Sequence, residues 1–243
     1  CSSDLADLLT IVAPGLFGDV YWGRWFLWEV CPFIGVVALL LALLGLAAGE
    51  AQTRRIYLPL ALLFGLLALG KYTPLFNLLY RLAPGFDRFR GPARFLPLAQ
   101  LFVALLAGVG LEKLVARTPR THTVGVIGLV LAGLLGLTAM LATSESRWQA
   151  ILQRMSRSEE TNLQSARYAQ PKFVVSTRTA ARAALSGAAG KLLVASLLLL
   201  ASARWPRLAW GVGLLLALEL LVFARSNRPV ADLRASRPPP AID

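Results

Sequence analysis

The sequence predicts an all-α membrane protein, a polytopic bundle of about six transmembrane helices with one amphipathic helix at the outer surface. Three observations lead to this fold class. Hydrophobic residues make up 56% of the 243 positions, and only 16% are charged, against about a quarter in soluble proteins. The apolar residues gather in blocks near bilayer-spanning length, whereas a soluble bundle shows amphipathic stripes. The basic residues concentrate between these blocks.

Six apolar blocks define the predicted spans, which are 33–48, 56–70, 95–115, 124–142, 185–203 and 208–224. The first block is short, because it covers only about 24 Å at a rise of about 1.5 Å per residue. Aromatic side chains suited to the headgroup layer precede it, namely Tyr21, Trp22, Trp25, Phe26 and Trp28. The second block is also short, and its Pro59 falls in the first turn, where a missing N–H costs little.

The blocks divide the chain into an outer aromatic segment (1–31), a transmembrane region (32–226) and the start of a truncated outer C-terminal segment (227–243). The chain is expected to be a piece of a longer protein, since it lacks an initiator Met and stops within a proline-rich run. Its opening residues, Cys1 to Leu5, resemble the translation of common sequencing-adapter DNA and are not taken as native.

The net charge of +12 does not predict binding to nucleic acid. Its basic residues lie where they meet lipid phosphates and fix topology, without a basic helix or an aromatic–basic platform. Cys1, Cys31 and the single His122 form no ligand cluster, so neither a metal site nor a cofactor is predicted.

The short connections carry the densest positive charge, which predicts that they face the cytoplasm of a multi-pass protein in the cell inner (plasma) membrane. The N-terminal segment, the 71–94 and 143–182 loops and the C-terminus then face outward. The basic residues of the short connections are Arg54, Arg55, Lys113, Arg117, Arg120, Arg204 and Arg207.

Glycines recur in pairs within the apolar blocks, and we expect them to let neighbouring helices approach closely. The pairs are Gly45 with Gly49, Gly108 with Gly110, Gly125 with Gly128, Gly133 with Gly136, and Gly211 with Gly213. A nucleotide-binding role would require a strand before such glycines, and no strand is predicted.

Three guanidinium groups, Arg88, Arg90 and Arg94, precede the third block, where Gly91-Pro92 fixes a bend. A helix start adds free N–H groups and a positive dipole end, and arginine forks match phosphate oxygens. This arrangement favours a lipid-phosphate or diphosphate site at the outer surface. The alternative is that these arginines only meet phospholipid headgroups. Lys71 and Tyr72, after the second block, are candidates for the same site, although Lys71 is equally explained by snorkelling.

Two further features stand out in the apolar and loop regions. Glu219 is a carboxylate inside an apolar block, and pairing with an arginine of another helix is favoured over a role in a substrate cavity. The spans are otherwise expected to be nearly free of ionisable groups. Trp148, Ile151, Leu152 and Met155 follow helical spacing and predict an amphipathic helix on the outer surface, which either packs there or caps a lipid groove.

Several runs resemble the YfhO-type bacterial membrane proteins: 67–76, Phe89 to Phe95 with its Arg-x-Pro-x-Arg-like core, 107–111, 33–35 and 238–242. That family is placed with the GT-C glycosyltransferases, which take a sugar from a polyprenyl-phosphate carrier on the outer face. The resemblance implies such a donor and a cell-envelope glycan or polymer as acceptor. Arg90 and Arg94 belong to the resembling motif, and the chemistry of their guanidinium groups predicts that they contact the carrier phosphate. The family's catalytic carboxylate lies in a first outer loop that this chain is expected to lack, so no catalytic residue is assigned.

Two functions therefore follow from the sequence. The first is a membrane glycosyltransferase, whose fragment alone is expected to be inactive. The alternative is a membrane transporter or flippase, or a non-catalytic envelope-assembly protein. A transporter would show broken helices and buried polar residues near the middle of the membrane.

Overall fold

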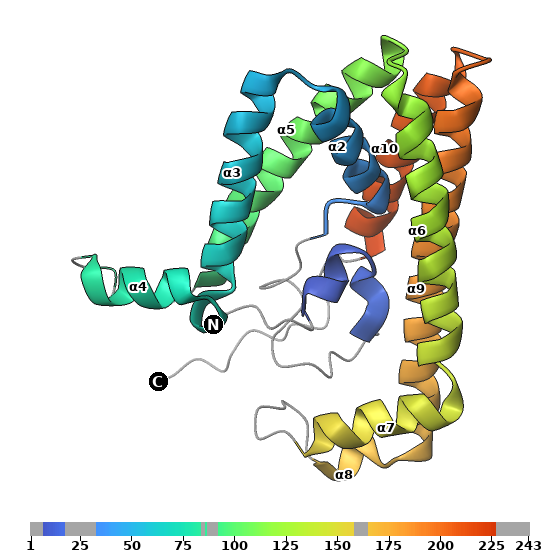
Figure 1. The fold of residues 1–243 in the computed structure, drawn as a ribbon. Coiled ribbons are helices and arrows are strands. Elements are labelled where there is room, and N and C mark those ends of the chain that lie inside the picture. The colour runs from blue at the N-terminus through green and yellow to red at the C-terminus, as the bar shows by residue number, and fades with distance from the viewer. Residues whose placement is uncertain (1–6, 18–32, 84–85, 87–91, 158–164, 227–243) are drawn as a thin grey trace, which may run out of the picture.

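The computed structural model describes residues 7–17, 33–83, 86, 92–157 and 165–226. These residues form helices without a strand, which confirms the all-helical class (Figure 1). The longer helices are α2 (Val36–Ala48), α3 (Ala51–Ala68), α5 (Leu96–Val115), α6 (Arg120–Ala142), α9 (Pro171–Ser202) and α10 (Leu208–Ser226). The shorter elements are η1 (Asp7–Ile11), η2 (Pro14–Phe17), η3 (Gly70–Tyr72), α4 (Pro74–Leu82), η5 (Pro92–Phe95), α7 (Glu145–Ser156) and α8 (Ser165–Tyr168).

Four of the described helices, α5, α6, α9 and α10, are long and apolar enough to cross a membrane. The expected count of about six is therefore not reached among the described residues. The first predicted span corresponds to α2, whose 13 residues cover only about 20 Å. The second corresponds to α3, whose mean hydropathy is lowered by Gln52, Arg54 and Arg55 in its first turns.

The outer faces of these four helices are apolar. Only 17% to 39% of their most hydropathic windows are buried inside the molecule. Leu134, Met140, Leu214 and Val222 are each more than half exposed. Apolar surface of this extent is stable against lipid rather than water, so the chain is a membrane protein.

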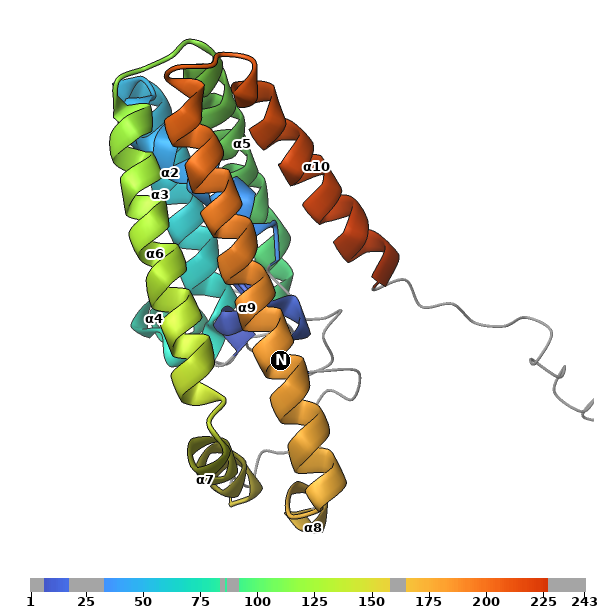
Figure 2. The same ribbon diagram turned by 90° about the vertical axis from the view of Figure 1, so that its right-hand side faces the viewer.

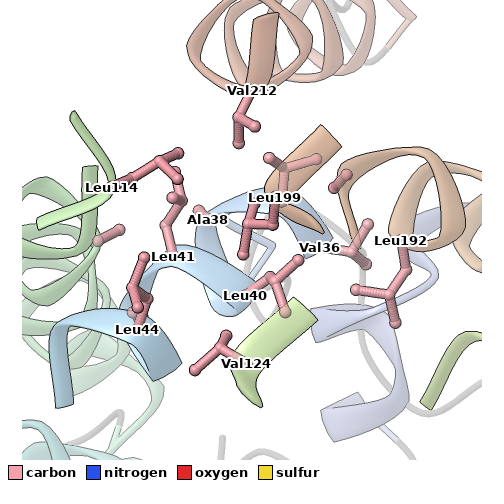
Figure 3. Packing of buried hydrophobic residues seen from close by; sticks show 14 of the residues in the cluster. Val36, Ala38, Leu40, Leu41, Leu44, Leu114, Val124, Leu192, Leu199 and Val212 are labelled. Carbon is pink, nitrogen blue, oxygen red and sulfur yellow. The ribbon is translucent and has the colours of Figure 1, made fainter. Parts of the chain in front are cut away.

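Helix α2 lies inside the bundle. Eight of its 13 residues are buried and the other five are partly buried, so none is exposed. Figure 3 shows Val36, Leu40 and Leu41 among side chains from the surrounding helices, including Leu114 of α5, Val124 of α6, Leu199 of α9 and Val212 of α10. Since α2 packs mainly against protein, this helix does not need the length of a membrane span.

The contact of α2 with α5 depends on glycine. A Cβ atom at Gly45 would collide with the carbonyl oxygen of Leu106, and one at Gly110 would collide with that of Leu41. These two glycines therefore permit the close approach that the sequence predicted. Gly108 and Gly133 have no atom within 4 Å of such a Cβ, so at these positions the prediction was wrong.

Helices α6 and α9 run side by side along most of their length (Figure 2). The predicted 143–182 loop contains α7, α8 and the beginning of α9, which starts at Pro171 rather than near 185. The predicted apolar block, 185–203, corresponds only to the second half of α9. Its first turns are held by protein contacts instead, since Phe173 and Ala181 pack with Leu16 and Trp148 in a second buried cluster.

The elements separate between two ends of the bundle (Figure 1). The three short connections, 49–50, 116–119 and 203–207, lie together at the upper end of that view. Helices α7 and α8 lie at the lower end, and α4 and the start of α5 lie at the lower ends of α3 and α5, nearer the middle of the view, with α4 and α7 running across the long helices. This is the division into basic short connections and longer opposite segments that the sequence predicted.

Candidate functional site

The predicted phosphate site lies partly within the described residues. Arg88 and Arg90 lie outside them. Arg94 belongs to η5, immediately before α5, and its side chain is exposed. Lys71 and Tyr72 form the end of η3; the side chain of Lys71 lies outside the described part, and Tyr72 is 40% exposed.

Packing between α3 and α5 brings these segments to the same end of the helix pair. Ala68 and Leu96 are buried together against Phe95. The ring of Phe64 stacks on Phe95 with centroids 6.1 Å apart and on Phe102 with centroids 5.9 Å apart. These contacts fix the end of α3 beside η5, so the η3 segment and Arg94 share one end of the molecule.

The corner after η3 is held by Thr73. Its hydroxyl donates to the carbonyl oxygen of Leu66 at 3.0 Å and accepts from the backbone N–H of Phe76 at 3.4 Å. The second bond caps the start of α4. Tyr72 is therefore part of a defined turn. Arg94 lies in η5, which continues directly into α5, and its exposed guanidinium is suited to an anionic headgroup.

A second polar site lies in the interior of the bundle. The side chain of Glu219, on α10, has no exposed area, and its Oε1 lies 2.8 Å from the ammonium nitrogen of Lys191 on α9. Its Oε2 accepts a hydrogen bond of 3.1 Å from the backbone N–H of Val37, in the first turn of α2. One carboxylate therefore contacts both a cation and a helix N-terminus.

The backbone just before α2 passes close to this carboxylate at Gly35. Gly35 has a φ of 96°, a conformation that side chains rarely adopt, and a Cβ there would lie 2.7 Å from Oε2 of Glu219. The ammonium of Lys191 lies 5.6 Å from the centroid of the Phe33 ring, and that ring lies 4.5 Å from the ring of Phe223. The ion pair is thus bordered by aromatic rings.

Charges at both ends of α2 match its dipole. Glu219 lies at the N-terminus. At the C-terminus, Arg54 donates to the carbonyl oxygen of Leu46 at 3.4 Å, and Arg120 donates to that of Ala47. Opposite partial charges at helix ends favour this placement. Two arginines of the short connections therefore also have a structural role.

The ion pair joins two of the candidate membrane spans. Lys191 is 11 residues before the end of α9, and Glu219 is 11 residues after the start of α10. Each is therefore about 17 Å along its helix from the turn that joins them, a distance shorter than the thickness of a hydrocarbon layer, about 30 Å.

Lys191 was not among the residues predicted from the sequence. The expectation that the spans hold almost no ionisable group besides Glu219 was wrong, because Lys191 lies within the predicted 185–203 span. The partner of Glu219 is accordingly a lysine rather than an arginine. The sequence did contain a signal for this residue, because Lys191 is a single charge within the apolar block 185–203, directly after Gly190.

The predicted amphipathic helix is α7. Trp148 and Leu152 are buried, and the indole N–H of Trp148 donates to the hydroxyl of Thr177 on α9 at 3.2 Å. Within the described ranges, no three His, Cys, Asp or Glu side chains group closely enough to hold a metal ion.

The fold and its exposed apolar faces define a multi-helix membrane protein with a polar site at one end and an ion pair in its interior. Comparison of the chain with protein-family models, with curated proteins and with solved structures gives no match.

Proposed function

We propose that the chain is part of an integral membrane glycosyltransferase similar to the GT-C type, which transfers a sugar from a polyprenyl-phosphate carrier to a cell-envelope acceptor. The reaction takes place at the outer face of the inner (plasma) membrane. The observation that carries the proposal is the placement of η3 and Arg94 at one end of the α3–α5 pair, beside the start of α5. The YfhO-like residues around Arg94 support it.

In this proposal the arginines bind the anionic side of the donor. As the sugar leaves the carrier, negative charge develops on the lipid phosphate, and guanidinium groups already in place stabilise it. Arg94 supplies one such group, with Arg88, Arg90, Lys71 and Tyr72 as further contacts. A carboxylate activates the acceptor hydroxyl in such chemistry, and no carboxylate of this chain is assigned that role.

The test is made in the full-length protein. Replacing Arg90 and Arg94 by alanine is expected to abolish sugar transfer from a polyprenyl-phosphate donor, while membrane insertion is unchanged. Arg117→Ala/Arg204→Ala removes two exposed arginines at the opposite end and is the matched control, expected to retain transfer. Undiminished transfer by the Arg90/Arg94 variant would remove the phosphate-site assignment.

A transporter or flippase is the second candidate, and the Lys191–Glu219 pair favours it. Ionisable side chains and helix starts inside the membrane are typical of transport pathways. The variant Lys191→Met/Glu219→Gln removes both charges together. In proteoliposomes, loss of carrier-lipid translocation by this variant, with sugar transfer intact, would favour transport over transfer.

A further inference from the structure

A groove of about 330 Å³ lies between α7, α8 and the start of α9. Helices α7 and α8 lie at the opposite end of α6 and α9 from the short connections, in the lower part of Figure 1. The volume of the groove is within the range of about 300 to 1,000 Å³ that is typical of small-molecule sites. None of the residues considered for the donor phosphate lines it.

One wall of the groove is polar and regular. Glu145, Gln149 and Gln153 are spaced four residues apart on α7, so they lie on one face of the helix, and Ser156 continues the row. The two carboxamides together offer four N–H donors and two acceptor oxygens. A ligand that both donates and accepts hydrogen bonds is suited to this wall.

The charge of the wall is compensated. The carboxylate of Glu145 lies 3.2 Å from the guanidinium of Arg178, on α9. The uncharged carboxamides of Gln149 and Gln153 therefore remain as the groups free to select a ligand. This arrangement favours a neutral ligand over a phosphate.

The remaining surface of the groove is apolar and rigid. Tyr168, Pro171 and Val174 line it opposite the glutamines. Tyr168 is 3% exposed, and its ring meets Phe173 edge-on with centroids 5.6 Å apart. Trp148, bonded to Thr177 at 3.2 Å, fixes α7 on α9, so the polar wall is held in position.

We propose that this groove binds a neutral saccharide. Sugar rings present hydroxyl groups at their edges and C–H groups on their faces, which match a carboxamide row opposite an apolar surface. The assignment rests on the proposed function in one respect: the groove would hold the acceptor glycan on the same side of the membrane as the donor phosphate. Saccharide binding itself requires no transfer activity.

The test measures binding to the purified chain in phosphatidylcholine nanodiscs. The probes are maltotriose and the β-1,4-linked trimer of N-acetylglucosamine, with inorganic phosphate as the charged comparison, detected by saturation-transfer NMR. At least one trisaccharide is expected to bind, and Gln149→Leu/Gln153→Leu is expected to weaken its binding about tenfold or more, by loss of two or more hydrogen bonds.

Matched variants separate the groove from the rest of the molecule. Gln149→Glu/Gln153→Glu keeps α7 polar but removes the amide donors, and it is also expected to lose binding. Gln52→Leu replaces an exposed glutamine of α3, and Arg94→Ala alters the proposed phosphate site; both are expected to bind the saccharide normally. Absence of binding by the unaltered chain, or binding by both glutamine variants that is as tight as that of the unaltered chain, would overturn the proposal and leave the donor-site assignment untouched.

Discussion

At the scale of single residues, the interior ion pair is the feature with the largest energetic consequence. Glu219 has no exposed side-chain area, whereas the side chain of Lys191 is 35% exposed. Removing one partner of a buried pair leaves an uncompensated charge, which costs about 3 to 5 kcal/mol, whereas replacing both partners is often tolerated. The two residues should therefore respond unequally.

Lys191→Met is expected to be the most destabilising single change at this pair, lowering the free energy of unfolding by about 3 kcal/mol, because it leaves the fully buried carboxylate without a cation. Glu219→Gln is expected to cost less, because its amide oxygen still accepts from Val37 N–H and Lys191 is partly exposed. Equilibrium denaturation in mixed detergent micelles measures the free energy of unfolding of both variants.

The double variant Lys191→Met/Glu219→Gln provides the control for coupling. It should be more stable than Lys191→Met alone, so that the two losses are strongly non-additive. Additive losses would show that the two side chains do not interact as the 2.8 Å separation indicates.

At the scale of elements, α2 and α7 are held by different contacts. Helix α2 depends on the close approach of its backbone to α5. Helix α7 depends on the side chains of Trp148 and Leu152, which are buried between it and neighbouring elements. Each dependence can be tested by substituting the contact residue and, as a control, a residue of the same type at an exposed or uncrowded position.

Gly110→Ala is expected to destabilise the bundle by about 2 kcal/mol or more, because the added methyl group collides with the backbone of α2 and forces the helices apart. Gly108→Ala, on the same helix, meets open space and is expected to leave the thermal transition unchanged or slightly raised. Thermal unfolding in detergent distinguishes them. Equal effects would contradict the α2–α5 contact.

Trp148→Ala is expected to release α7 from α9, because it removes a buried indole and its hydrogen bond to Thr177. Hydrogen exchange should rise over α7 and the first turns of α9, while α5 and α6 keep their protection. Trp210→Ala, a change at a 67% exposed tryptophan, serves as the control. Unchanged exchange in α7 would contradict this anchoring role.

The sequence predicted the elements that carry strong periodicity or length. Helix α7 follows directly from the spacing of Trp148 to Met155, and the longest apolar blocks coincide with α5 and α6. The start of α9 was not predictable from apolar blocks, because Phe173 and Ala181 are stabilised by tertiary contacts in an otherwise polar stretch. The pairing of Lys191 with Glu219 joins two helices, and hydropathy along one segment contains no information on such a contact.

At the scale of the whole molecule, charge and structure agree on a division into two ends. The short connections with Arg117, Arg120, Arg204 and Arg207 lie together, and α4, α7 and the start of α5 all lie away from them, at the opposite ends of their long helices. The excess of arginine in short loops predicts that their end faces the cytoplasm. Both the donor site and the saccharide groove require the opposite end to face outward.

Cysteine labelling tests this orientation in intact cells. In a background with Cys1→Ser and Cys31→Ser, Ala150→Cys places a thiol on the exposed side of α7, and Ala116→Cys and Ala203→Cys place thiols at the short connections. A membrane-impermeant maleimide should label Ala150→Cys before permeabilisation and the other two only afterwards. The reverse pattern would place Arg94 and the groove in the cytoplasm, where an outward-facing carrier cannot be bound. The helical arrangement itself would be unaffected, since exposed apolar faces require lipid in either orientation.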